Sequence, residues 1–336
     1  MKKFRVGVDG IGVVGAEMIK VIRHRKFPAE EIRVLARRER NEIIAGQTYH
    51  VLPASLAAFK GLDFAFFAGT EGARGASQQW GWEAVKQGAI VIDNGDDYRM
   101  DPRVPLVIPE INPQALKKHQ GFVANPNCST IIALMVLAPL HRIARIRRFV
   151  VSTYQAVSGT GRNAVLELEE QIKQYAAGQL LTASVYPHQI ALNVIPKIGS
   201  VNADMHDFTS EEIKMRNETH KILEDKTIKI CATCVRVPVF YGHCEAINVE
   251  FDRKLSVADA LQTLSEAQGI TVTDDIENDK YPLPIDASGK DDVFVGRIRK
   301  DESAKNGISL FVSGDNIRKG AALNAVQIAE KIISAN

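Results

Sequence analysis

The sequence predicts an α/β protein with an N-terminal Rossmann-like domain and a second, α+β domain that holds a mixed sheet. Its 336 residues exceed what one typical core holds. Short apolar runs alternate with helical patterns in the first third, and the strand-like segments become longer after about Asn127. We expect residues 1–127 and 316–336 to form the first domain and residues 128–315 to form the second.

The first third of the chain has the pattern of βαβ units, in which buried parallel strands alternate with helices. We expect strands at Phe4 to Val8, Ile32 to Ala36, Phe64 to Ala68 and Ala89 to Ile92, and helices at about Val13 to His24 and Ala76 to Gln87. Because each connection holds a helical stretch, the strands are expected to form one parallel sheet.

The second part of the chain mixes longer strands with helices, which favours a mixed or antiparallel sheet. We expect strands at Arg148 to Ala156, Thr227 to Val239 and Glu245 to Phe251, and helices near Gly161 to Ala177, Ser210 to Asp225 and Val257 to Gln268. Residues 274–292, rich in Asp, Pro and Gly, indicate a long surface loop. The final segment, residues 315–336, has helical spacing and is expected to pack on the first domain.

Composition and charge argue against several protein classes. The chain is 45% hydrophobic and 24% charged, as soluble globular proteins are, and its net charge of +2 argues against a nucleic-acid-binding protein. The longest apolar run, Ile131 to Leu140, is too short to span a bilayer, and the N-terminus lacks a signal-peptide pattern. Four cysteines make no secreted disulfide framework in a chain this long, so we expect a cytoplasmic protein with reduced thiols and no membrane partner.

A glycine cluster follows the first predicted strand directly. Gly10, Gly12 and Gly15 form G-x-G-x-x-G before the first predicted helix. This pattern gives a tight turn, lets the backbone approach a pyrophosphate and aims a helix N-terminus at it. It therefore favours an N-terminal dinucleotide-binding domain. The alternative is a tight strand-to-helix turn with no ligand.

The residues after the second predicted strand bear on which dinucleotide binds. A site for NAD usually has Asp or Glu at this position, but here the chain continues as "LARRER". Arg37 and Arg38 would pair with a 2'-phosphate, which favours NADP as the cofactor. A solvated basic loop is the alternative interpretation.

One cysteine stands at a position suited to a nucleophile. Asn127 is a plausible N-cap, which would place Cys128 in the first turn of a helix. The helix dipole and the free N–H groups there favour a thiolate and would also hold an oxyanion. The apolar run behind the cysteine would anchor this helix in the core. The alternative is a small buried hydrophobic residue, the role that most cysteines have.

The other cysteines form no recognisable metal or redox motif. Cys231 and Cys234 lie three apart on a predicted strand and would face opposite sides of it, and no second C-x-x-C exists. Nearby, Arg236 and His243 lie on two predicted strands joined by a turn. Such a hairpin can aim both side chains into one pocket, where a thiol nucleophile needs a base and charge partners. A structural histidine is the alternative interpretation.

Several stretches, in order and over nearly the whole chain, resemble the aspartate-β-semialdehyde dehydrogenase family. They are "DNGDDYRMDPRVPLVIPEIN", "NPNCST", "STYQAVSGTG", "EEIKMRNET", "VRVPVFYGHCEAINVE", "VGRIRKD" and "DNIRKGAALNAVQIAE". The resemblance implies an NADP-dependent oxidoreductase that converts aspartyl-4-phosphate to aspartate semialdehyde through a cysteine thioester and releases phosphate. It also implies a homodimer formed through the second, catalytic domain, and a place in the biosynthesis of lysine (through diaminopimelate), methionine and threonine.

The resemblance assigns a role to each motif residue. It implies Cys128 as the nucleophile, His243 as the acid/base group and Gln155 as the group that orients the acyl intermediate. It implies a substrate site in which Arg236 holds the carboxylate, Glu211 the amine, and Lys214 and Arg99 the phosphate. Glu211 and Lys214 would share one helix face, although a surface ion pair is the alternative for them.

The predicted cofactor site draws on both domains, and no metal is expected. Its residues are Gly10, Gly12, Val13, Gly15, Arg37, Arg38, Gly69, Gly159 and Asn316. For Gly159, in "SGTG" before a helix, a plain loop without ligand is the alternative.

Three departures from the family pattern concern the cofactor side. The first fingerprint is "DGIGVVG" where the family usually has G-x-x-G-x-x-G, and "ARRER" and "DNGDD" stand where serines are common. Asp96 and Asp97 near Arg99 would weaken anion binding there. Two other functions stay open at this point: a related acyl-phosphate or acyl-CoA reductase, such as one acting on N-acetylglutamyl-phosphate or malonyl-CoA, and a non-catalytic paralogue.

Overall fold

The computed structural model of the chain describes residues 2–69 and 75–335, which form two compact units. The first unit comprises Met1–Asn127 and Ala321–Asn336, and the second comprises Cys128–Gly320. The chain thus returns to the first unit at Ala321, five residues after the expected position at Asn316. Among the described residues, no helix is long and apolar enough to cross a membrane.

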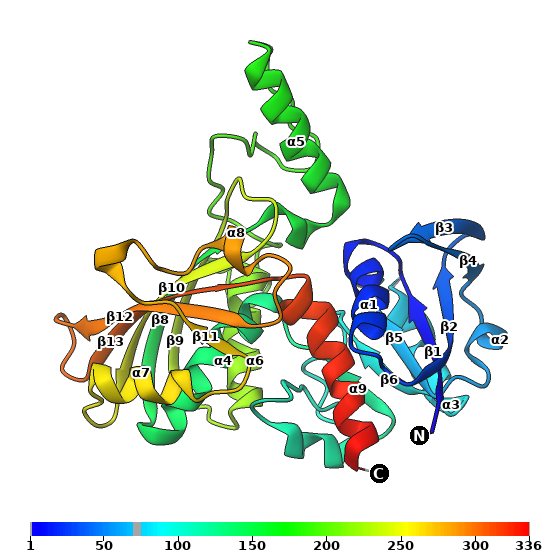
Figure 1. Cartoon of the computed structure of the whole chain (residues 1–336), viewed down its shortest axis with the longest axis horizontal. Helices are drawn as coiled ribbons and strands as arrows, with labels where there is room; N and C mark the ends of the chain where they lie inside the picture. Colours follow the sequence, from blue (N-terminus) through cyan, green and yellow to red (C-terminus); the bar gives the residue numbers. More distant parts are fainter. Residues whose placement is uncertain (1, 70–74, 336) are drawn as a thin grey trace. The chain divides into compact units, whose positions relative to one another are not determined.

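The first unit is built on a seven-stranded sheet with the strand order β3-β4-β2-β1-β5-β6-β7 (Figure 1). Its strands are β1 (Phe4–Asp9), β2 (Ala29–Ala36), β3 (Arg40–Ile44), β4 (Gln47–Pro53), β5 (Phe64–Phe67), β6 (Ile90–Asp93) and β7 (Phe122–Ala124). All neighbouring pairs are parallel except β3 and β4, which form an antiparallel hairpin. The expected parallel sheet and its four predicted strands are confirmed, whereas the hairpin and β7 were not predicted.

Helices cover the first sheet and complete its core. They are α1 (Val13–His24), α2 (Leu56–Phe59), α3 (Trp82–Lys86) and α9 (Leu323–Ala335), with a π-helical turn η1 (Ser77–Gly81) and a 3₁₀ turn η2 (Pro113–Lys118). The one helix predicted from Ala76 to Gln87 is therefore a π turn followed by a short α-helix. Helix α9 packs on α1 and β6, as expected for the C-terminal segment, and Ile328 and Ile332 lie in the same core as Val6 and Val8.

The second unit contains a six-stranded mixed sheet with the strand order β11-β12-β13-β10-β8-β9. Its strands are β8 (Ile146–Gln155), β9 (Lys229–Arg236), β10 (His243–Phe251), β11 (Ile270–Val272), β12 (Val293–Asp301) and β13 (Gly307–Gly314). The pairs β8–β9 and β11–β12 are parallel, and the other pairs are antiparallel. The expected mixed sheet is confirmed, although β11, β12 and β13 were not predicted as strands. The hairpin expected between the strands of Arg236 and His243 is wrong, because β8 lies between β9 and β10 and pairs with both of them.

Three of the helices in the second unit pack on the same face of its sheet (Figure 1). The helices of this unit are α4 (Cys128–Ile143), α5 (Arg162–Ala176), α6 (Ser210–Ile222), α7 (Val257–Ser265) and α8 (Pro284–Ala287), with 3₁₀ turns η3 (Val157–Thr160) and η4 (Ile276–Asn278). A π turn, η5 (Arg318–Ala322), crosses into the first unit. Helix α4 contacts β8, β10, β12 and β13, while α6 contacts β9 and α7 contacts β11 and β12. The region 274–292 is mostly irregular, as predicted, and holds only η4 and α8.

Helix α4 is the central element of the second unit. Residues 129–138 are all buried, so the helix is apolar around its whole circumference rather than along one stripe. Burial of each of its Ile, Leu and Val side chains contributes about 1.5–3 kcal/mol. The first turn of α4, which begins at Cys128, is therefore held in a fixed position in the second unit.

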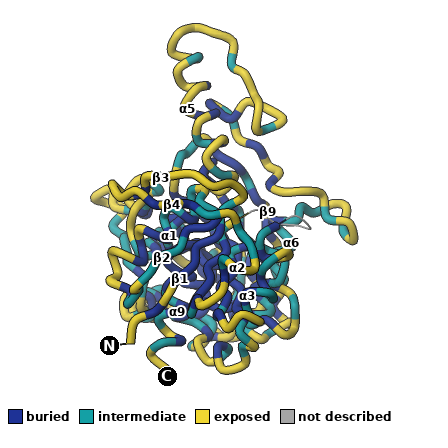
Figure 2. Tube along the Cα trace, turned by 90° about the vertical axis from the view of Figure 1, so that its right-hand side faces the viewer, coloured by how far each residue is buried: buried dark blue, intermediate teal, exposed yellow. Residues whose placement is uncertain are grey.

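Helix α5 extends from the second unit with its own small core. Val157, Ala164, Leu168, Ile190 and Ile195 form that core. The outer part of α5 and the chain that follows it are exposed (Figure 2), and their surface includes Leu180, whose exposed fraction is 90%. This segment therefore presents apolar side chains outside the core of the unit.

We predict that alanine lowers stability strongly at one glycine of the first turn and hardly at another. A Cβ at Gly15 would lie 1.8 Å from the carbonyl oxygen of Gly10, whereas a Cβ at Gly12 would meet no described heavy atom within 4 Å apart from its chain neighbours. Gly15→Ala is expected to lower the free energy of unfolding by more than about 2 kcal/mol, as backbone overpacking does. Gly12→Ala, the matched control, is expected to change it by less than about 1 kcal/mol. Urea unfolding measures both, and equal losses would contradict the prediction.

Candidate active site

The three glycines of the first unit have three different geometric roles. Gly10 has φ +91°, and a Cβ there would lie 2.6 Å from the backbone nitrogen of Gly69. Gly15 lets α1 pack directly on the Gly10 carbonyl. Gly12 faces open space at the N-cap position of α1, and no side chain among the described residues caps this helix. These roles are a tight turn, a close helix–strand contact and an open approach to free N–H groups, which fit a dinucleotide pyrophosphate.

The other predicted cofactor residues of this unit lie around the same end of the sheet. Val13 is the first residue of α1, and Gly69 follows β5 and contacts Gly10 through the close approach just described. Arg37 and Arg38 are exposed in the bend that follows β2. All four therefore stand at the carboxyl ends of parallel strands, where open α/β sheets bind their ligands.

A buried carboxyl group beside this turn was not predicted. Asp9, the last residue of β1, is 4% exposed, and burial raises its pKa to about 6. Its Oδ2 atom has no hydrogen-bond partner among the described residues. In the sequence, the only sign of this aspartate was the altered glycine fingerprint, which reads "DGIG".

Arg99 is fixed inside the first unit by backbone carbonyl groups. Its Nε donates to the carbonyl oxygen of Asn125 at 2.9 Å, and its Nη2 donates to that of Asn94 at 2.7 Å. Burial raises the pKa of nearby Asp93 to about 6, and the Arg99 charge partly offsets this rise. Of the two acidic residues that depart from the family pattern, Asp97 accepts a hydrogen bond from Ser77 at 3.1 Å.

The candidate nucleophile of the second unit begins helix α4. Cys128 is its first residue and is partly exposed. Gly320 packs against it so closely that a Cβ at Gly320 would lie 2.9 Å from the Cβ of Cys128. One turn further along α4, Ile132 packs on Gly314, which pairs with His243 across β13 and β10. These contacts place the start of α4 at the His243 end of the sheet.

The side chains of Gln155, Arg236 and His243 form a polar row at that end of the sheet. Gln155 pairs with Arg236 across β8 and β9, and the antiparallel pairing of Cys244 with Tyr154 puts His243 opposite Gln155. All three are at least 95% buried. A Cβ on Gly159 would lie 3.1 Å from the Arg236 Nη1 atom and 3.3 Å from the His243 Nε2 atom, so this glycine keeps one side of the row open.

His243 is held as a neutral imidazole with one nitrogen available. Its Nδ1 accepts a hydrogen bond from the backbone N–H of Ala156 at 3.0 Å, which leaves the proton on Nε2 in the neutral ring. The Nε2 atom has no partner among residues 2–69 and 75–335. Burial, and then the charge of Arg236, lower the pKa of His243 well below its usual range. Arg236 is itself fixed, since its Nη1 donates to the Ala156 carbonyl oxygen at 2.6 Å.

Helix α6 brings a carboxylate to the same row. Its N-terminus carries a capping box between Thr209 and Glu212, which fixes the first turn. Glu211 is 7% exposed and accepts a hydrogen bond from the Gln155 Nε2 atom at 3.1 Å. Lys214 lies 3.9 Å from the Glu211 carboxylate on the same helix face. The pair thus borders the polar row instead of lying on the outer surface.

Asn316 links two loops that border the row. Its Oδ1 accepts a hydrogen bond from the backbone N–H of Gly242 at 3.0 Å, and its Nδ2 donates to the Ser158 hydroxyl at 3.1 Å. The preceding Asp315 accepts hydrogen bonds from the N–H groups of Ile317 and Arg318, which shapes the turn before Gly320.

The structure therefore brings the predicted residues together in two groups. In the second unit Cys128, Gln155, Gly159, Glu211, Lys214, Arg236, His243 and Asn316 surround one end of the sheet. In the first unit Gly10, Gly12, Val13, Gly15, Arg37, Arg38 and Gly69 gather at the carboxyl ends of β1, β2 and β5, while Arg99 belongs to a separate cluster with Asp93. The sequence analysis missed Asp9 and Gly320. The contact of Gly320 with Cys128 joins positions 192 residues apart, which no local pattern records.

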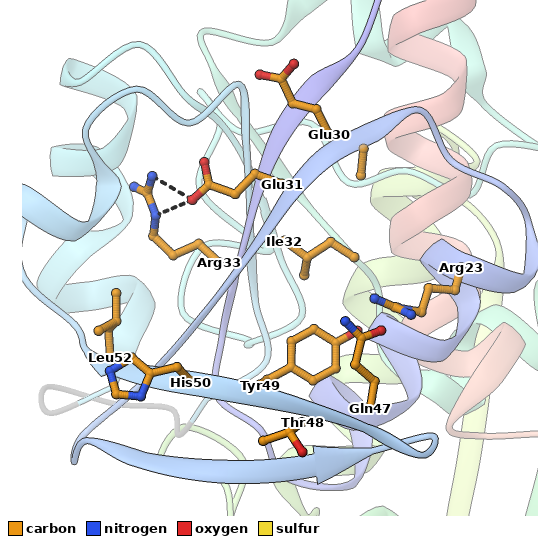
Figure 3. A pocket seen from close by; sticks show the side chains of 11 residues that line it. Arg23, Glu30, Glu31, Ile32, Arg33, Gln47, Thr48, Tyr49, His50 and Leu52 are labelled. Carbon is orange, nitrogen blue, oxygen red and sulfur yellow. Dashed lines mark hydrogen bonds and ion pairs between the residues drawn. The ribbon is translucent and has the colours of Figure 1, made fainter.

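A cavity elsewhere in the first unit is not the active site. A polar cavity of about 480 Å³ lies where β4 diverges from β2 (Figure 3), and it is lined in part by the ion pair of Arg33 and Glu31 at 2.9 Å. It is on the amino-terminal half of β2, away from the glycine turn. In the described part of the chain, no cluster of three or more His, Cys, Asp or Glu side chains is arranged to hold a metal ion.

Comparison with known proteins identifies the class first. The NAD-binding domain model of semialdehyde dehydrogenases matches residues 5–119, and their dimerisation domain model matches residues 137–319. The two domains are therefore those of a nicotinamide-dependent semialdehyde dehydrogenase.

The relatives then narrow the assignment. Aspartate-semialdehyde dehydrogenase of Aquifex aeolicus is 46% identical over 98% of both chains, and that of Bacillus subtilis is 42% identical over 98% of this chain and 97% of the relative. Crystal structures of aspartate semialdehyde dehydrogenase II from Vibrio cholerae, one of them complexed with ASA, have a TM-score of 0.92 at 38% identity and 99% coverage of both chains. The chain belongs to the aspartate-semialdehyde dehydrogenase family.

We predict that the alkylation rates of the four thiols do not follow the order of their solvent exposure. Cys231 is exposed and Cys128 only partly so, yet Cys128 is expected to react several times faster with iodoacetamide near pH 7.5 because it begins a helix. Cys244 and Cys234 are expected to react last, since burial raises the pKa of the Cys244 thiol to about 11 and that of Cys234 further. Peptide mass spectrometry after timed alkylation measures each rate, and faster labelling of Cys231 would contradict the prediction.

Proposed function

We propose that this chain reduces L-aspartyl-4-phosphate to L-aspartate 4-semialdehyde with NADPH, through a thioester on Cys128. The observation that carries the proposal is the polar row of Gln155, Arg236 and His243 at the end of the sheet where α4 begins with Cys128. The names of the full-length relatives agree with this reaction.

The thiol and the imidazole form the reacting pair in this proposal. Cys128 attacks the acyl carbon of the substrate after its proton passes to the neutral His243, and phosphate leaves as the thioester forms. To take that proton on Nε2, the ring has to carry its own proton on Nδ1, so the hydrogen bond from the Ala156 N–H to Nδ1 breaks before proton transfer. His243 then holds a proton that it can return when the thioester on Cys128 is reduced and the aldehyde is released. The Gln155 amide, fixed by Glu211, orients the acyl group, and the N–H groups at the start of α4 stabilise its oxygen.

The substrate's charged groups match the charges around the row. Arg236 offers a planar guanidinium for the α-carboxylate, and Glu211 offers a carboxylate for the α-amine. Lys214 and Arg99 are proposed to contact the phosphate. The burial of Arg236 and Glu211 supports this assignment, because buried charges interact more strongly than solvated ones.

NADPH would supply hydride to the thioester carbon. We propose that the turn from Gly10 to Gly15, with Val13 and Gly69, holds the pyrophosphate, and that Arg37 and Arg38 hold the 2'-phosphate. Gly159 and Asn316 would border the nicotinamide. The open space at Gly12 and the start of α1, which no side chain of the described residues caps, support the pyrophosphate assignment.

The chain is proposed to work as a homodimer in the cytoplasm. Helices pack on one face of the second sheet, and the other face presents Tyr154 and Phe311, whose rings lie 6.1 Å apart, next to exposed Asn248. A second copy would cover this half-exposed face, in keeping with the dimerisation domain model that matches here. A catalytic thiol also needs a reducing compartment.

The first test of the function measures turnover directly. Phosphate-dependent oxidation of aspartate semialdehyde is expected with NADP, with lower kcat/KM for NAD, and Cys128→Ser is expected to lower kcat by at least about 1,000-fold. The double variant Arg37→Ala/Arg38→Ala should lower the preference for NADP, while Arg40→Ala serves as the matched control. Turnover of N-acetylglutamate semialdehyde or malonate semialdehyde in place of aspartate semialdehyde would overturn the substrate assignment, and an unchanged preference would overturn the role of the arginines.

A second test uses the lowered pKa of His243. A general base works in its neutral form, which is present above its pKa, so turnover at saturating substrate is expected to persist to pH values below the ordinary histidine range. Arg236→Gln removes the cation that lowers this pKa and is expected to move the acid limb of kcat upward. Arg216→Gln, on the same unit but without contact to the row, is the control. An acid limb that stays fixed or moves downward in Arg236→Gln would contradict the proposed base.

A further inference from the structure

A second row of side chains lies directly behind the polar row. Residues two apart on a strand share a face, so Thr153, Cys234 and Glu245 stand behind Gln155, Arg236 and His243. Thr153 pairs with Cys234 on β9 and with Glu245 on β10, which makes the three a continuous row across the sheet. One step further back the same face becomes apolar, with Val151, Ala232 and Ile247. The polar region is thus two rows deep.

Glu245 is the unexplained member of the second row. It is fully buried, and neither of its carboxyl oxygens has a hydrogen-bond partner among the described residues. Burial raises its pKa well above the usual range and so favours the neutral carboxylic acid over the carboxylate. An apolar residue would fill this position at lower cost, as Ile247 and Val249 do further along β10.

Thr153 connects this second row to the reacting groups. Its hydroxyl donates to the Gln155 Oε1 atom at 3.0 Å and accepts from the backbone N–H of Val235 at 3.3 Å. Gln155 in turn donates to Glu211 at 3.1 Å. The direction of the Thr153 hydroxyl therefore decides which end of the Gln155 amide faces Glu211. A hydroxyl oxygen has two lone pairs, and Val235 uses one of them. The Cys234 side chain also lies within hydrogen-bonding reach of this hydroxyl, but its thiol proton is directed at the Met215 sulfur, 3.8 Å away.

We propose that Glu245 is a positioning residue, whose carboxylic acid proton is donated to the remaining lone pair of the Thr153 hydroxyl and so fixes the Gln155 amide for catalysis. Directly opposed residues of an antiparallel pair have Cβ atoms about 4.5–5.5 Å apart, so a glutamate side chain reaches the threonine opposite it by rotation. With both lone pairs occupied, the hydroxyl proton has to point at Gln155, and the amide cannot turn over. Glu245 touches no substrate in this arrangement.

The experiment compares two replacements of similar size. Glu245→Gln keeps a donor and is expected to retain kcat within about twofold, whereas Glu245→Met keeps the volume, removes the donor and is expected to lower kcat about tenfold with little change in KM. Ile247→Met, on the same face of β10, is the matched control and should keep kcat. Thermal unfolding of each variant separates loss of fold from loss of turnover. Full activity in Glu245→Met, or equal losses in the Gln and Met variants, would overturn the proposal.

A double-mutant cycle tests the route through Thr153. Thr153→Val is expected to lower kcat about tenfold, and Glu245→Met/Thr153→Val is expected to lose no more than Thr153→Val alone, because both remove one connection. Losses that multiply to about 100-fold would show independent action and contradict the proposed route. The inference rests on the proposed function, but different results would refute each of them. If the wild-type chain does not turn over aspartate semialdehyde, the proposed function is refuted. If the wild type is active and the losses of the two variants multiply, only the role of Glu245 is refuted.

Discussion

The constraint on which the site depends is the burial of helix α4 from Ser129 onward. A helix that is apolar on every side has one stable place in the unit, and its first residue is then fixed in position and direction. Cys128, as the first residue of α4, takes its position from that helix. The contact with Gly320 adds a second restraint, since the chain after β13 can pass the thiol only with a glycine there.

Burial also sets the protonation states at the end of the second sheet. Desolvation is the largest cause of the lowered pKa of His243 and of the raised pKa of Glu245. Arg236 cannot become neutral, so it is held by the Ala156 carbonyl oxygen instead. The result is a fixed positive charge on Arg236 beside the neutral imidazole of His243. This arrangement suits a substrate that carries negative charge and releases phosphate, which is itself an anion.

The sequence predicted the elements that depend on local patterns and missed those that depend on partners. The βαβ alternation and the long strands β8 and β10 follow from apolar spacing, and the motif residues follow from resemblance. The hairpin of β3 and β4 was missed because its strands are half-exposed and polar, with "RNEII" and "QTYHVLP" giving no clear period. Glu245 lies opposite Thr153 because of the register between β10 and β8. These two residues are 92 positions apart, and the sequence alone does not fix the register of strands so far apart.

The altered glycine turn shows how a departure from a family pattern is accommodated. With Gly10, Gly12 and Gly15 the turn, the open approach and the close packing are all present, although the glycines are spaced differently. The cost is Asp9, a carboxyl group beside a site for an anionic ligand. Because burial raises its pKa to about 6, this carboxyl group takes up a proton near neutral pH more easily than an ordinary aspartate does. Burial thus lets the turn keep an aspartate that would repel a pyrophosphate if it stayed ionised.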